Sequence, residues 1–207
     1  MINTVILLTA DAGSEAIASH LHTAIQAMNP EVTITHQAAA PRYPAAPPAT
    51  LICPLSLDLP AAAPPAYTQW QDLAAQRTWA TQLDYATGDG DLWLPIIWTA
   101  KGPLYGEAID PSDHAPYPHP LNDAQRQPLY ALAYQLLSHY QAMPSVYMLG
   151  FRVVGDLEIQ FDRVIPFPNP AAIASLGRQT PDLFTCHWLC LSGQPIRDVT
   201  VLPAAIA

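Results

Sequence analysis

The sequence predicts an α/β (α+β) protein in which a small β-α-β-β lobe precedes a larger half with two β-hairpins and packed helices. The first observation is a continuous apolar run at residues 3–9, which a stripe of apolar residues at helical spacing follows. The second is a pair of turn signals, Lys101-Gly102 and Gly155-Asp156, each lying between two strand-like segments. The third is Asn122 with Gln125 three residues later, a capping-box pattern that predicts the start of a helix.

The first lobe begins with a strand at 3–9 that is apolar throughout, as a strand buried on both faces would be. Asp11 or Ser14 is expected to cap the helix that follows, and Asn29-Pro30 to end it. The segments "EVTITH" and "ATLICPLS" then read as two further strands. This order of elements predicts a small lobe with a parallel sheet.

Alanine and proline dominate residues 38–66 outside the strand around Ile52, which is typical of stiff connectors. We therefore place a boundary here, with one lobe at 1–66 and the larger half at 67–207.

The larger half is expected to begin with one helix, "YTQWQDLAAQRTWATQL" at 67–83. A hairpin, "LWLPIIWTA" and "PLYGEAID", follows, and then the capped helix and a second hairpin, "SVYMLGFRVV" and "LEIQFDRVI". The chain is expected to close with a short helix, "TPDLFTCHWLCL" capped by Thr180, and a strand, "IRDVTVL".

Composition excludes several classes of function. The formal net charge of -9 works against nucleic acid and anionic membrane surfaces, since both require clustered basic residues. The apolar runs are too short to insert into a membrane, and the start of the chain lacks the basic flank of a signal peptide. Three cysteines do not suggest a secreted disulfide framework, so we expect a cytoplasmic protein with reduced thiols.

The order of elements from residue 91 resembles the C-terminal half of the ATP-grasp fold, especially D-alanyl-D-alanine ligases and their relatives. The stretches that carry the resemblance are "YGEAI", "LNDAQRQPLYALAYQLL", "GFRVVGDLEIQFDRVIPFP" and "IASLGRQTPDLF". In that family a glutamate and an asparagine of the closing box, and an aspartate of the preceding strand, hold the magnesium ions that bridge the nucleotide phosphates.

This chain departs from the family at those positions. In register, the family's glutamate falls on Arg163, its asparagine on Ile165 and its aspartate on Gly150, so that only Asp162 remains as an oxygen donor. The sequence also lacks the family's Gly-rich loop, and Lys101 is its only lysine. The resemblance therefore implies a curtailed, degenerate ATP-grasp-like protein that takes no cofactor, with Mg²⁺ and ATP as the alternative.

Two hypotheses about function follow. The first is a non-catalytic binding or assembly protein that holds a protein or a small acidic partner. The alternative is an ATP-dependent ligase-like enzyme, or one subunit of a split one, with Lys101, Arg152, Asp162 and Arg163 in an altered phosphate site. Pairing of the arginines with neighbouring carboxylates is the structural alternative, and whether the chain is an enzyme stays open.

Two groups of residues could bind a metal. Cys186, His187 and Cys190 form a C-H-x-x-C pattern in which the two cysteines share a helix face, although buried thiols explain the pattern as well. The loop "DPSDHAPYPHP" offers Asp110, Asp113, His114 and His119, residues that a solvated loop also carries. Either group is a candidate metal site.

Aromatic residues are numerous for a chain with few charges. The sequence contains five tryptophans and nine tyrosines, and these residue types dominate both cores and interface hot spots. We therefore expect a protein partner or a homo-oligomer.

Overall fold

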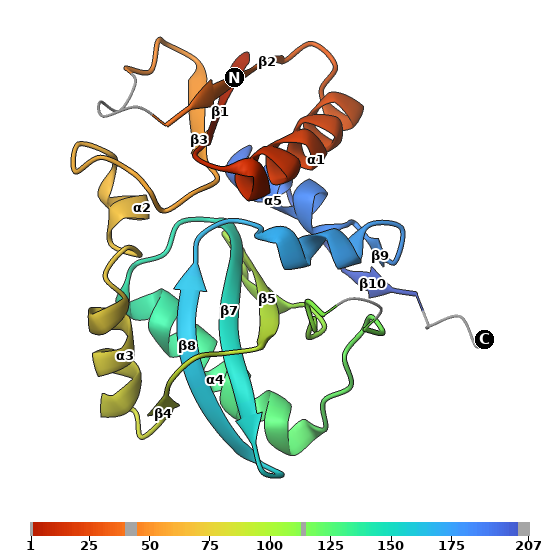
Figure 1. Ribbon diagram of the computed structural model, residues 1–207. Helices are drawn as coiled ribbons and strands as arrows, with labels where there is room; N and C mark the ends of the chain where they lie inside the picture. The colour runs from red at the N-terminus through yellow and green to blue at the C-terminus, as the bar shows by residue number, and fades with distance from the viewer. Residues whose placement is uncertain (1, 40–44, 113–114, 203–207) are drawn as a thin grey trace.

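A computed structural model describes residues 2–39, 45–112 and 115–202. Figure 1 shows a small lobe at the N-terminus above a larger sheet, with helices on both faces of that sheet. The α/β class predicted from the sequence is confirmed. Among the described residues, no helix combines the length and the apolar character that crossing a bilayer requires.

The small lobe is the predicted β-α-β-β unit. Its sheet has the order β2-β1-β3, formed by β1 (Thr4–Thr9), β2 (Thr33–Ala38) and β3 (Thr50–Pro54), and both pairings are parallel as predicted. Helix α1 (Ala12–Met28) is capped by Asp11, whose side chain accepts a hydrogen bond from the Ser14 backbone. The Ser14 hydroxyl accepts one in return from the Asp11 backbone, so the two candidate caps form one capping box.

The larger sheet has the order β4-β8-β7-β5-β6. Its strands are β4 (Ala86–Thr87), β5 (Leu92–Thr99), β6 (Gly102–Tyr105), β7 (Ser145–Val154) and β8 (Glu158–Ile165). Both predicted hairpins are present, β5 with β6 and β7 with β8, and both are antiparallel. The second turns at Gly155, whose φ of 60° favours glycine. Strand β6 ends at Tyr105, earlier than predicted.

Helices cover the two faces of this sheet differently. Helices α3 (Leu73–Gln82) and α4 (Asp123–His139) pack on one face, where the buried residues of α4 meet Leu149, Phe151 and Phe161 of the sheet. Helix α5 (Leu183–Leu191) packs on the other face against β5 and β7, and also against α1. Figure 1 shows α5 near the end of the sheet closest to the small lobe, so the far end of this face is not covered by it.

The short elements complete the chain. Helix α2 (Pro65–Thr68) precedes α3, the 3-10 helix η1 (Pro170–Ser175) precedes α5, and β9 (Gln179–Thr180) pairs with β10 (Thr200–Val201). One hydrophobic cluster includes Val5 and Leu21 of the small lobe together with Val146 and Phe184 of the larger half. The boundary at residue 66 stays a prediction.

Three local predictions are wrong. The helix expected at 67–83 is two helices, because Asp72 caps α3 and Trp70 is buried in the break between them. The cap of α5 is Asp182 rather than Thr180, since the Asp182 carboxylate accepts from two backbone N–H groups of the first turn. The closing strand is confined to Thr200–Val201.

Candidate functional site

The pairing of β7 with β8 identifies the residues on the face of the sheet that α5 leaves open. Met148 pairs with Ile165 and contributes to the cluster beneath α5. Because side chains alternate between faces, the next pair on the same face is Gly150 with Arg163. Gly150 also pairs with Trp93 of β5. The open face therefore carries Trp93, Gly150 and Arg163 side by side.

A β-bulge places Asp162 at the same position. Gly150 pairs with Arg163 while Phe151 pairs with Phe161, so Asp162 is the extra residue of β8. Its side chain is only 8% exposed. A Cβ built on Gly150 would lie 3.4 Å from Asp162 Oδ2, so the bulge turns this carboxylate toward Gly150 on the open face.

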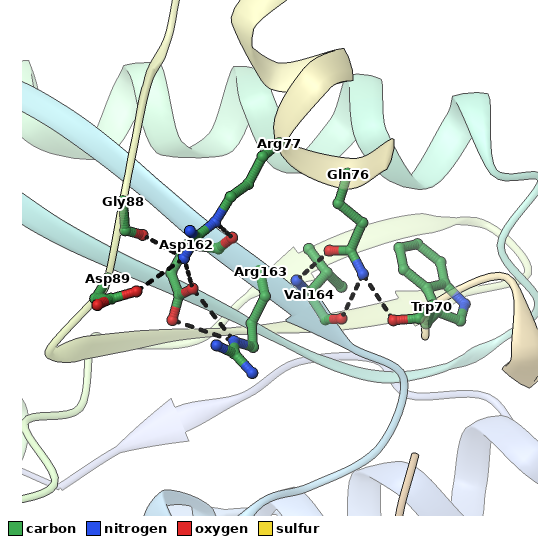
Figure 2. Close-up of polar contacts among 8 residues, drawn as sticks. All are labelled: Trp70, Gln76, Arg77, Gly88, Asp89, Asp162, Arg163 and Val164. Atoms are coloured by element: carbon green, nitrogen blue, oxygen red, sulfur yellow. Dashed lines mark hydrogen bonds and ion pairs between the residues drawn. The ribbon is translucent and has the colours of Figure 1, made fainter. Parts of the chain in front are cut away.

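Arg77 of α3 holds the Asp162 carboxylate in place. Its Nη2 lies 2.7 Å from Asp162 Oδ1, and its Nε donates to the Asp162 backbone carbonyl (Figure 2). The same Nη2 also donates to the Gly88 carbonyl and pairs with Asp89 at 3.1 Å. The hydrogen bond to Asp162 is the largest cause of the raised pKa of Arg77. Arg77 therefore links α3 to β8 through its Nε and Nη2.

Arg163 and Arg152 are engaged at one nitrogen only. Arg163 donates from Nε to both Asp162 oxygens at 3.2 Å, and Arg152 donates from Nε to Asp91 Oδ2 at 2.9 Å. In the described part of the chain, the terminal nitrogens of both arginines have no hydrogen-bond partner. Their side chains are 41% and 46% exposed. Each guanidinium is thus oriented by a carboxylate and presents free N–H donors.

Both arginines lie on the same face. Arg152 follows Gly150 by two residues on β7, and Arg163 stands opposite Gly150 on β8. Diagonal neighbours across two antiparallel strands are roughly 7 to 8 Å apart, a span that two arginine side chains can bridge. Because guanidinium groups bind carboxylate and phosphate oxygens through paired N–H donors, this arrangement suits an anion.

Trp93 fills the space above Gly150. Its Cζ3 would be 3.2 Å from a Cβ built on Gly150, closer than ordinary van der Waals contact. The indole therefore occupies the place that a side chain at position 150 would take, and it lies beside the arginines as a partly exposed aromatic surface.

The structure does not bring Lys101 to this site. Lys101 lies in the turn between β5 and β6, eight residues beyond Trp93 on the chain, which is roughly 25 Å along a strand. It lines a pocket of about 130 Å³ together with Thr99, Pro144, Cys190 and Ile196. Of the four predicted site residues, Arg152, Asp162 and Arg163 come together, and Lys101 is separate.

The C-H-x-x-C residues do not converge on a metal site. His187 is completely buried, and its Nε2 lies 3.5 Å from the Cys53 sulfur while its Nδ1 accepts from the Val146 N–H. The Cys186 thiol instead contacts the Pro181 carbonyl, and Cys190 lines the pocket beside Lys101. Within residues 2–39, 45–112 and 115–202, no three histidine, cysteine or acidic residues gather around a possible ion.

The predicted loop site is only partly described. Asp113 and His114 lie outside the described residues. Asp110 and His119 approach each other to 3.9 Å, and the Asp110 carboxylate accepts a hydrogen bond from the Ser112 backbone. Hydrogen bonding to the Ser112 side chain, and then to its backbone N–H, lowers the pKa of Asp110.

Some aromatic residues lie at the surface and others in the core. Trp70 and Trp188 are buried, whereas Tyr134 of α4 is 53% exposed beside Trp98. Tyr105 stacks on Tyr130 at a centroid distance of 4.1 Å. The expectation of a protein partner or a homo-oligomer stays a prediction.

Sequence reasoning missed two residues of the site. Arg77 lies within the helix predicted at 67–83, and its charge is the one signal in the sequence that it meets a carboxylate. Trp93 falls in a predicted strand and among the five tryptophans that suggest core or interface, and its position two residues after Asp91 places it at the same strand end as the partner of Arg152.

Comparison with solved structures supports the ATP-grasp-like fold. The chain is similar to N5-carboxyaminoimidazole ribonucleotide synthetase from Thermotoga maritima, with a TM-score of 0.74 and 8% identity over 98% of this chain and 79% of that one. It is also similar to the N5-carboxyaminoimidazole synthase of Aspergillus clavatus in complex with ADP and 5-aminoimidazole ribonucleotide (TM-score 0.72, 10% identity, 95% and 78% covered). A third match is glycinamide-RNase-transformylase T from Mycobacterium tuberculosis, with a TM-score of 0.64 and 15% identity over 93% of this chain and 80% of that one.

Comparisons of sequence give no match: neither a family model nor a curated protein is similar to this chain. The structural matches therefore establish the fold alone. The narrower likeness to D-alanyl-D-alanine ligases and the degenerate status stay predictions.

The expectation that the chain takes no cofactor is corrected by this comparison. The solved structures that share its fold include one in complex with ADP, that of the Aspergillus enzyme, so a chain with this fold can bind a nucleotide. The matched structures are named as a synthetase and a synthase. The residues present fit an anion such as phosphate, because Arg152 and Arg163 offer free donors. They do not fit magnesium, because both Asp162 oxygens already accept from guanidinium groups.

Proposed function

We propose that this chain is an ATP-dependent ligase-like protein with an altered phosphate site on the open face of its larger sheet. Arg163 and Arg152 bind the phosphate oxygens, while Asp162 and Asp91 hold the two guanidinium groups in position. The observation that carries the proposal is that each of these arginines is anchored through Nε and keeps its terminal nitrogens free.

Two further features support the proposal. The Asp162 carboxylate is itself held by Arg77, so the orientation of Arg163 is fixed by a chain of ion pairs rather than by one exposed contact. Preorganised donors bind an anion without a cost for ordering the side chains. Trp93 adds an aromatic surface next to the arginines, of the kind on which a purine base stacks.

The segment between β3 and β5 favours a second candidate function, one subunit of a split ligase. Residues between β3 and β5 form only α2, α3 and β4, and they contain no lysine. A subunit of a split ligase, completed by a second chain that covers the phosphates, is therefore the second candidate. Turnover by this chain alone would count against it.

Thermal unfolding with and without Mg-ATP tests the proposal. A ligand at about a hundred times its dissociation constant adds about 2.7 kcal/mol, which corresponds to a rise in Tm of roughly 5 to 10 °C for a chain of this length. We expect this rise in the original protein and in the control variant Arg197→Gln, which loses the same charge at an exposed position.

The Arg163→Gln and Arg152→Gln variants should lose most of the rise. Formation of ADP above the level of Arg163→Gln would support the catalytic part of the proposal. If neither Mg-ATP nor ATP alone changes the Tm of the original protein, the whole proposal is refuted.

A further inference from the structure

The residues around Arg152 and Arg163 also bear on whether a nucleotide binds there with or without magnesium. We infer that the site takes the phosphates of a nucleotide that carries no magnesium ion, with guanidinium groups supplying the positive charge. This inference rests on the proposed function, and it follows from the oxygen donors, the space and the charge at the site.

The oxygen donors are already engaged. Asp162 Oδ1 accepts from Arg77 at 2.7 Å and from Arg163 at 3.2 Å, and Oδ2 accepts from Arg163 at 3.2 Å. Magnesium requires near-octahedral oxygen ligands at about 2.0 to 2.1 Å. An ion at Asp162 would have to displace a guanidinium and remain beside its charge, which Coulomb repulsion opposes.

The neighbouring strand offers no second donor. Gly150 stands opposite Arg163 and has no side chain, and Trp93 fills the space above it. The remaining carboxylates nearby, Asp89 and Asp91, each use one oxygen in an ion pair with an arginine. They lie on the segment before β5, with side chains 90% and 54% exposed, so no buried donor set surrounds a common point.

The charges favour a free polyphosphate. Three arginines (Arg77, Arg152 and Arg163) balance three aspartates (Asp89, Asp91 and Asp162), and the donors that remain free are all guanidinium N–H groups. A nucleotide without magnesium has more negative charge and more free phosphate oxygens than its magnesium complex. Because guanidinium groups bind phosphate oxygens directly, magnesium would occupy oxygens that the arginines use.

Calorimetric titration of the full chain with ATP, in excess EDTA and in excess magnesium, tests this inference. We expect ATP to bind in EDTA at least as tightly as with magnesium. The Arg163→Gln variant should bind about 10- to 100-fold more weakly in EDTA, because a hydrogen-bonded charge is lost. The Arg197→Gln variant should bind as the original protein does.

The other outcomes separate this inference from the proposed function. Binding that requires magnesium would overturn the inference and leave the proposed function in place. Binding in EDTA that Arg163→Gln does not weaken would also overturn it, because the phosphates would then lie elsewhere. An absence of binding in both solutions would overturn the inference and the proposed function together.

Discussion

The side-chain amide of Gln76 bonds to both backbone groups of Val164. Val164 N–H donates to Gln76 Oε1 at 2.6 Å, and Gln76 Nε2 donates to the Val164 carbonyl at 3.3 Å and to the Trp70 carbonyl at 2.9 Å (Figure 2). Strand β4 pairs with β8 only at Gln160 and Phe161. Gln76 therefore takes the place of a neighbouring strand where the edge of β8 runs beneath α3, next to the Arg77–Asp162 pair.

Replacing this glutamine should be costly. The Gln76→Leu variant leaves buried backbone groups of Val164 and Trp70 without partners, and each such group costs about 1 to 3 kcal/mol. Since three such groups lose their partner, we expect the free energy of unfolding in urea to fall by at least about 3 kcal/mol. The control is Gln82→Leu, the same change at an exposed position of α3. Equal effects of the two changes would contradict the role given to Gln76.

The Arg77–Asp162 pair should couple more strongly than the exposed pair beside it. The Asp162 side chain is 8% exposed, whereas both members of the Arg152–Asp91 pair are about half exposed. Removing one partner of a largely buried pair leaves a charge without compensation, and exposed pairs contribute about 1 kcal/mol or less.

Two double-mutant cycles compare these pairs by urea unfolding. The first combines Arg77→Met with Asp162→Asn, and the second combines Arg152→Met with Asp91→Asn. We expect a coupling free energy of about 2 kcal/mol in the first and under about 1 kcal/mol in the second. A coupling that is no larger in the first cycle would show that Arg77 does not hold Asp162.

Replacing each of two glycines before β5 by alanine should affect stability differently. A Cβ on Gly90 would lie 2.7 Å from the Phe151 backbone nitrogen, and this strand cannot retreat without breaking the sheet. A Cβ on Gly88 would instead meet the end of the flexible Gln160 side chain. We expect Gly90→Ala to lower the free energy of unfolding by about 1 to 3 kcal/mol and Gly88→Ala to change it much less. A Gly88→Ala effect as large as that of Gly90→Ala would argue against this packing.

Local patterns in the sequence were sufficient to predict most elements of the fold. Capping boxes at Asp11 and Asn122 and the glycine turn at Gly155 are signals within a few residues, and the structure has an element boundary at each. The break between α2 and α3 was missed because it depends on burial of Trp70 against Tyr140 and Tyr147, residues distant in the sequence.

The site was predictable only in part for the same reason. Arg152, Asp162 and Arg163 lie on one hairpin, so their proximity follows from strand register. Arg77 reaches Asp162 from a helix 85 residues earlier, and the bulge that turns Asp162 toward Gly150 has no signal in the sequence. Lys101 was grouped with the arginines by charge, and the length of β5 separates it from them.

The hydrogen bonds of His187 make the stability of the protein depend on pH. The Val146 N–H donates to Nδ1, so the proton of the neutral ring lies on Nε2, which faces the Cys53 sulfur at 3.5 Å. Burial raises the pKa of the Cys53 thiol to about 12, so the thiol is neutral, and burial lowers the pKa of His187 to about 3. The neutral imidazole joins β3, β7 and α5.

The unfolded protein therefore binds a proton at His187 before the folded protein does. The ordinary pKa of 6.5 lies above the folded value of about 3, so the contribution of His187 to stability is complete above pH 6.5 and declines as the pH falls toward 3. The decline approaches about 1.4 kcal/mol per pH unit and amounts to about 1.7 kcal/mol between pH 6.5 and 5. Urea unfolding at several pH values, with the original protein and His187→Asn, measures this. The variant keeps an acceptor for Val146 but cannot titrate, so its free energy of unfolding should fall less on acidification. Parallel pH profiles for the two proteins would mean that other groups, and not His187, produce the acid sensitivity.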